Sequence, residues 1–173
     1  MQEHGLKISE LVTLFNLEVL NRGSDYDTAL LTITDVNRPG LQFHSFYDYF
    51  DPRRLQVLGK AEITYLKGLT TEQRRKCFDD LFLYDIPALV ISRGLDCFPE
   101  CLESARVHER TLLRTEETTV EFTSHTIEYL NRVLAPCVTR HGVLLDISGE
   151  GVMITGDSGI GKSESAIELI MRG

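Results

Sequence analysis

The chain has 173 residues, of which 42% are hydrophobic and 25% charged, as expected for a globular protein of one domain or one domain plus part of another. Its 18 Lys and Arg against 26 Asp and Glu give a formal net charge of -8. This acidity argues against a nucleic-acid or anionic membrane surface, because both need clustered cations. The sequence has no run of apolar residues long enough for a membrane span and no secretory signal pattern, so we expect a cytoplasmic protein.

Short elements are predicted at the start of the chain. Apolar residues at close to helical spacing predict a helix over residues 6–15, and a short strand is expected at 17–20. The Pro and Gly of residues 35–40 are typical of a turn. A helical stretch around residues 46–50 is expected next.

Strands and helices then alternate. Residues 88–92 form a continuous apolar run, which is typical of a strand buried on both faces. Thr70 or Thr71 is expected to cap the longest helix of this region. The predicted elements are strands at 55–59, 88–92 and 111–115, and helices at 61–66, 72–83 and 101–105. Three strand–helix pairs in about sixty residues predict a small parallel α/β domain.

A domain boundary is predicted near Pro136. Residues 118–134 carry apolar side chains at helical spacing, and the proline ends that helix because its ring is incompatible with a helix interior. The predicted organisation is therefore an N-terminal α/β domain of residues 1–135, followed by residues 136–173 as the start of a second domain.

The second region contains the most informative motif. Strands over 142–147 and 151–155 predict a β-hairpin, which leads into a glycine-rich loop and then a helix over 163–171. The loop matches G-x-x-x-x-G-K-[ST], and its residues are Gly156, Asp157, Ser158, Gly159, Ile160, Gly161, Lys162 and Ser163. Such a loop turns backbone amides toward a polyphosphate, so we expect ATP binding, with Lys162 on the outer phosphates and Ser163 as a Mg²⁺ ligand.

His141 is a second candidate. In an antiparallel pair the start of the first strand lies beside the end of the second, so His141 is expected near the beginning of the loop. A histidine there can contact a phosphate or assist proton transfer. The alternative is a surface histidine that simply precedes a strand, and the pattern alone leaves both readings open.

Other candidate groups carry weaker signals. Cys97 and Cys101 are four residues apart, but without a second Cys/His pair they favour reduced, mostly buried thiols over a zinc site. The aromatic residues of 46–50 favour core packing over a ligand cage. Residues 92–94 follow a strand where open α/β sheets bind ligands, although a plain loop is the simpler reading.

Residues 141–147 and 151–164 resemble the HPr kinase/phosphorylase family, and so do residues 37–40, 49–51 and 92–95. The resemblance implies a bifunctional enzyme of bacterial carbon regulation, which phosphorylates a serine of the phosphocarrier HPr with ATP and Mg²⁺. It also implies removal of that phosphate by phosphorolysis, with inorganic phosphate and pyrophosphate as further ligands, and a homohexamer. His141 and Lys162 match catalytic positions of the family, and 156–163 match its ATP site.

One departure from the family pattern concerns the proton acceptor. The family's essential aspartate follows the helix that starts at Lys162, and the chain ends at Gly173 before it. We therefore expect these residues alone to be inactive. Two alternatives are a regulatory or oligomerisation module with an incidental, incomplete phosphate loop, and an unrelated P-loop NTPase.

Overall fold

The computed structural model describes residues 5–172, which form two compact units that divide between Ala135 and Pro136. The first unit is an α/β domain built on a five-stranded sheet with strand order β2-β7-β6-β5-β4. Strands β4, β5, β6 and β7 run parallel, and β2 pairs with β7 in the antiparallel sense. The strands are β2 (Glu18–Asn21), β4 (Val36–Asn37), β5 (Leu55–Leu58), β6 (Leu89–Ile91) and β7 (Leu112–Arg114).

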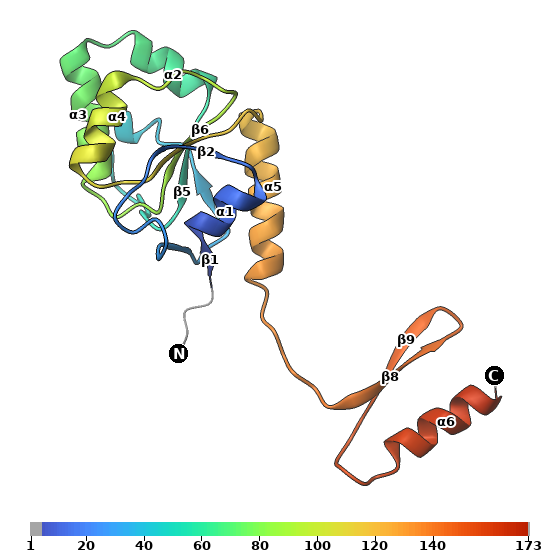
Figure 1. Ribbon diagram of the computed structural model, residues 1–173. Coiled ribbons are helices and arrows are strands. Elements are labelled where there is room, and N and C mark those ends of the chain that lie inside the picture. The colour runs from blue at the N-terminus through green and yellow to red at the C-terminus, as the bar shows by residue number, and fades with distance from the viewer. Residues whose placement is uncertain (1–4, 173) are drawn as a thin grey trace. The chain divides into compact units, whose positions relative to one another are not determined.

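Helices cover both faces of this sheet. Figure 1 shows α3 and α4 on one side of the strands and α1 and α5 on the other. The helices of the first unit are α1 (Ile8–Leu14), α2 (Lys60–Lys67), α3 (Thr71–Phe82), α4 (Pro99–Val107) and α5 (Thr119–Val133). A two-stranded antiparallel pair, β1 (Leu6–Lys7) with β3 (Leu30–Leu31), lies outside the main sheet. The predicted parallel α/β class is confirmed.

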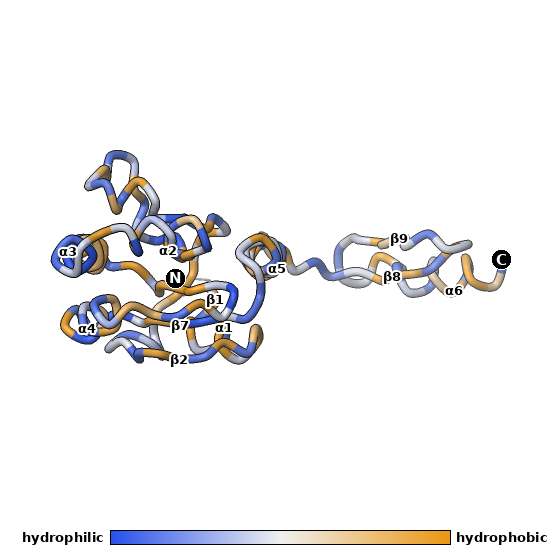
Figure 2. Tube along the Cα trace, turned by 90° about the horizontal axis from the view of Figure 1, so that it is seen from above, coloured by the Kyte–Doolittle hydropathy of each residue, from blue (hydrophilic) through white to orange (hydrophobic). Residues whose placement is uncertain are grey.

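Side-chain alternation along the strands divides the interior into two cores. Leu89 and Ile91 pack into the cluster that includes Phe78 of α3, whereas Val90 between them packs into the cluster that includes Phe122 of α5. Successive strand residues point to opposite faces, so a strand covered by helices on both sides is apolar throughout. Figure 2 views α5 end-on and shows hydrophobic and hydrophilic residues around it, as an amphipathic helix requires.

Capping residues fix where the longer helices begin. The Thr70 hydroxyl accepts a hydrogen bond from the Gln73 amide at the start of α3, and Thr118 accepts one from Glu121 at the start of α5. In both helices the side chain of the third helical residue accepts a hydrogen bond from the amide of the cap residue, which completes a capping box. Thr70, not Thr71, is therefore the cap of α3.

Three local predictions are wrong. The helix predicted over residues 6–15 begins only at Ile8, because Leu6 and Lys7 form strand β1 and pair with β3. Residues 46–50 are not helical, because Ser45 and Tyr49 have φ values of 60° and 63°, and left-handed residues interrupt a helix. The local helix is instead a 3₁₀ turn, η1 (Gln42–His44). Within the predicted turn at 35–40, Val36 and Asn37 form strand β4, because they pair with the edge of β5.

The second unit consists of a β-hairpin and one helix. Strands β8 (Gly142–Ile147) and β9 (Glu150–Thr155) pair in the antiparallel sense, and α6 spans Lys162–Arg172. Ser148 and Gly149 have φ values of 55° and 87°, the double positive φ that closes a two-residue hairpin turn. No helix within residues 5–172 is long and apolar enough to cross a membrane.

Candidate phosphate-binding site

The loop between β9 and α6 has the backbone of an anion cradle. Gly159 and Gly161 have φ values of 83° and 91°, a region that glycine enters without steric cost. A Cβ added at Gly159 would meet no atom within 4 Å, so the backbone faces open space at this point. Residues 156–160 are all exposed, which leaves the loop accessible to a ligand.

Several amides of this loop lack a backbone acceptor among the described residues. Within the described part of the chain, the amides of Ser158, Gly159 and Gly161 have no backbone acceptor. The first-turn amides of α6 add donors that no carbonyl of the helix can reach. Backbone donors together with the positive end of a helix dipole favour a phosphate group.

Lys162 folds back over the loop. Its Nζ donates to the Gly156 carbonyl oxygen at 2.8 Å and to the Asp157 carbonyl oxygen at 2.5 Å. The ammonium group is therefore held within reach of the loop by neutral carbonyl acceptors, which a phosphate oxygen can replace because it also carries a negative charge. Ser163, the next residue, is exposed at the start of α6.

The hairpin register determines where His141 lies. Gly142, which follows it, pairs with Thr155, which precedes Gly156. A Cβ at Gly142 would lie 2.7 Å from the Ile154 carbonyl oxygen, so this close approach of the two strands requires glycine. The hairpin thus brings the exposed His141 beside the first residue of the loop, although twenty-one positions separate it from Lys162.

The donor set fits Mg²⁺ accompanied by a nucleotide better than a metal held by protein groups alone. No cluster of three or more His, Cys, Asp or Glu suitable for a metal occurs among residues 5–172. Mg²⁺ in phosphate sites takes one or two protein oxygens and completes its octahedron with water and phosphate oxygens. The Ser163 hydroxyl is suited to that limited role.

The carboxyl end of β6 is a poor anion site. Arg93 and Gly94 have φ values of 65° and 57°, but their amides already donate to Glu117 and Thr115 carbonyl oxygens, each at 2.8 Å. A Cβ at Gly94 would lie 2.4 Å from a Glu116 carboxylate oxygen. Because these amides are already hydrogen-bonded and a carboxylate lies beside them, the segment is a structural loop and does not offer an anion site.

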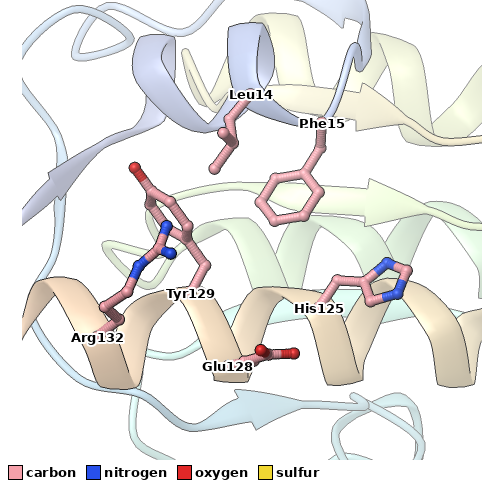
Figure 3. Close-up of a pocket in the computed structure, with 6 residues that line it drawn as sticks. All are labelled: Leu14, Phe15, His125, Glu128, Tyr129 and Arg132. Atoms are coloured by element: carbon pink, nitrogen blue, oxygen red, sulfur yellow. The ribbon is translucent and has the colours of Figure 1, made fainter. Parts of the chain in front are cut away.

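The first unit has a separate cavity of about 340 Å³ between α1 and α5. Figure 3 shows its lining, which consists of Leu14, Phe15, His125, Glu128, Tyr129 and Arg132. The Arg132 guanidinium lies 5.1 Å from the centre of the Tyr129 ring, and the Phe15 and Tyr129 rings meet edge to face. The cavity was not predicted from the sequence, because its lining residues come from segments more than a hundred positions apart.

The remaining candidate side chains are the aromatic residues of 46–50 and the other histidines, none of which belongs to the second unit. Tyr47 stacks on Tyr84, and Phe50 packs against both. Phe46 and Tyr49 are 45% and 99% exposed, so the predicted core packing is wrong for these two residues. The His44 ring lies 4.5 Å from that of Tyr65. His4 lies outside the described residues.

Comparison with models of known protein families shows to which family the chain belongs. Residues 6–130 match the family model described as the HPr Serine kinase N terminus, and residues 132–173 match the HPr Serine kinase C-terminal domain. The chain belongs to the HPr serine kinase family. The resemblance predicted from the loop and the hairpin is thereby confirmed.

Curated relatives support the same assignment. Proteins named HPr kinase/phosphorylase are 46% identical in Alkaliphilus metalliredigens and 44% identical in Clostridium perfringens strain SM101, over 97% and 98% of this chain. The one from Clostridium beijerinckii is 46% identical over 98% of the chain. The chain spans about half the length of these relatives, 54% or 55% in each case.

Among solved structures, the chain is similar to the CBS and DRTGG domains of the regulatory region of Clostridium perfringens pyrophosphatase, a structure complexed with diadenosine tetraphosphate. The TM-score is 0.52 with 15% identity, over 73% of this chain and 49% of the other. At this identity the similarity concerns the fold alone.

Proposed function

We propose that the second unit supplies the ATP site of a bifunctional HPr kinase/phosphorylase. The observation that carries the proposal is the hairpin register, which brings His141 beside a loop whose amides have no backbone acceptor. Family membership and the names of the relatives give the reaction class: phosphorylation of an HPr serine and its reversal by phosphorolysis. The family assignment also removes the alternative of an unrelated P-loop NTPase.

Each residue of the site has a proposed role. The amides of 156–161 and of the first turn of α6 bind the phosphate chain, and Lys162 leaves its loop carbonyls for the outer phosphates. Ser163 holds Mg²⁺, which when bound neutralises charge on the phosphates. His141 holds or moves a proton beside the phosphate, a role that suits an exposed imidazole near neutral pH.

Residues 1–173 are proposed to be inactive on their own. Phosphoryl transfer also needs a carboxylate for the metal and an acceptor for the serine proton. The active protein is proposed to be a cytoplasmic homohexamer that uses ATP and Mg²⁺ and binds HPr, phosphate and pyrophosphate, without nucleic acid or membrane as partners.

The first unit, residues 1–135, is proposed as a regulatory or assembly domain. Its two cores, which are formed by residues of this unit, favour this role. This reading makes the unit a partner of the kinase domain and gives it no share in the chemistry.

The test is transfer of labelled phosphate from ATP to HPr by the full-length protein that contains this chain. We expect transfer to wild-type HPr, none to an HPr serine-to-alanine variant, and loss of transfer in Lys162→Ala. His141→Ala is expected to lower kcat by roughly 10²–10⁴, the usual contribution of a general acid or base. Lys60→Ala, at an exposed position of α2 in the first unit, is the matched lysine control. Undiminished transfer by Lys162→Ala would overturn the proposal.

A further inference from the structure

The last residue pair at the open end of the hairpin controls the distance between His141 and the loop that joins β9 to α6. Gly142 of β8 pairs with Thr155 of β9 at this end. The next residue is His141 on one strand and Gly156 on the other. Consecutive Cα atoms are about 3.8 Å apart, so neither residue can move far from the pair. The separation of the two backbones at Gly142 therefore determines how close His141 lies to the loop.

At this pair the two backbones are closer than a residue with a Cβ allows. A Cβ added at Gly142 would lie 2.7 Å from the Ile154 carbonyl oxygen and 2.9 Å from Met153 Cε. The methionine methyl group is the end of a flexible side chain and can move aside. The carbonyl oxygen belongs to the backbone of β9 and can move only with that strand. Any side chain at position 142 must therefore push the strands apart by several tenths of an ångström.

The backbone conformation of Gly142 does not itself require glycine. The residue is exposed and lies in the extended strand β8. It is not among the glycines with positive φ, which in this unit include Gly149, Gly159 and Gly161. Among the described glycines of the second unit, it is the one whose added Cβ would come within 3.0 Å of another atom. The close approach of β9, and not the backbone conformation, is the reason for glycine at this position.

We propose that Gly142 is a positioning residue for phosphoryl transfer, because its lack of a side chain lets β8 approach β9 closely enough to hold His141 at the bound phosphates. The inference rests on the proposed function of the loop and adds a residue that acts through His141. A group that takes part in the reaction must be held within about 0.5 Å of its productive position. A displacement of about 1 Å can lower the rate by about 10²-fold. The strand separation that a Cβ imposes is therefore large enough to affect the reaction.

A second glycine of the same hairpin is the matched control. Gly151 of β9 pairs with Asp146 near the turn, at the other end of the ladder. It is also exposed and lies in a strand, and a Cβ added there would meet no atom within 4 Å. Gly142→Ala and Gly151→Ala make the same chemical change and restrict the unfolded chain to the same extent. Only Gly142→Ala forces the strands apart.

The experiment measures transfer of labelled phosphate from ATP to HPr by the full-length protein that contains this chain. Gly142→Ala should lower kcat by about tenfold or more, because His141 is displaced from the phosphates. The KM for ATP should stay within about twofold of wild type, since the loop that binds the phosphates is unchanged. Gly151→Ala should have the kcat and KM of wild type. A Gly142→Ala variant with the same kcat as Gly151→Ala would overturn the inference.

A double variant tests whether Gly142 acts through His141. Once the imidazole is removed, there is no group left to position, so His141→Ala/Gly142→Ala should have the same kcat as His141→Ala alone. A purely structural role of the glycine would instead lower kcat by the same factor in both backgrounds. A further loss of about tenfold in the double variant would therefore overturn the inference.

Amide hydrogen exchange separates this inference from the proposed function and from misfolding. With a non-hydrolysable ATP analogue and Mg²⁺, wild type and Gly142→Ala should both show slower exchange in residues 156–163. Loss of this protection in Gly142→Ala alone would mean that the glycine maintains the loop itself, which would overturn the positioning role and leave the proposed function standing. Absence of protection in wild type, or undiminished transfer by Lys162→Ala, would overturn the proposed function and the inference with it.

Discussion

The two units differ in how they bury their apolar residues. The first unit closes two cores around its sheet, one centred on Phe78 and the other on Phe122. Among residues 136–172, only Leu145 and Ala166 are buried hydrophobic residues, whereas Ile167 and Ile170 of α6 remain 59% and 67% exposed. The difference indicates that the first unit has a stable fold of its own, and that local hydrogen bonds of a hairpin and a helix hold the second.

The strongest test of this contrast removes one large side chain from each unit. Phe78→Ala should lower the free energy of unfolding by about 3–5 kcal/mol, because a fully buried ring leaves a cavity. Ile167→Ala should change it by less than about 0.5 kcal/mol, since the side chain is mostly exposed. Urea unfolding, followed by circular dichroism, measures both. Equal effects in the two variants would contradict the contrast.

A smaller change in the free energy of unfolding is expected when the ion pair that joins α3 and α4 is removed. Arg74 and Glu100 lie 2.8 Å apart with 17% and 8% of their side chains exposed. Glu100→Gln should cost about 1.5–3 kcal/mol at pH 7, the usual value of a hydrogen bond to a charged group.

The same variant gives a pH test. The hydrogen bond from Arg74 lowers the pKa of Glu100, so its stabilisation is complete above the unfolded-state pKa of about 4.3 and is lost as the pH falls through the folded-state value. The difference between wild type and Glu100→Gln should therefore shrink below about pH 4. Unfolding curves from pH 7 to pH 3 measure it, and a difference that does not change with pH would exclude the charged contact as its source.

The smallest expected change in stability concerns the hydrogen bonds to the first amides of a helix in each unit. At the start of α5 the Thr118 hydroxyl oxygen accepts a hydrogen bond from the Glu121 amide. At the start of α6 we propose that a phosphate accepts the corresponding hydrogen bonds. Thr118→Ala should lower stability by about 1 kcal/mol. Ser124→Ala, at an exposed position inside α5, is the control and should stay within about 0.5 kcal/mol. Equal changes in the two variants would assign the effect to helix propensity and not to the cap.

Elements with strong local signals were predictable from the sequence. The helical spacing of apolar residues over 118–134 identified α5, and the apolar run at 88–92 identified the buried strand β6. The hairpin and α6 also follow their patterns, since the strands flank a turn and the helix begins at Lys162. In each case the signal lies within the element itself.

Features that depend on distant partners were not predictable. Val36 and Asn37 resemble a turn until β5 supplies a parallel partner, and Ser45 and Tyr49 adopt left-handed conformations that their residue types do not predict. For the candidate site, sequence spacing placed the loop and the expected neighbour His141. The hydrogen bonds of Lys162 depend on side-chain geometry.

The central claim is that the second unit carries the nucleotide site, and amide hydrogen exchange of the full-length protein tests it most directly. The measurement compares the protein with and without a non-hydrolysable ATP analogue and Mg²⁺. We predict slower exchange in residues 156–163 and no comparable change around the cavity lined by Phe15 and Tyr129. Slower exchange at that cavity, with residues 156–163 unchanged, would contradict the account.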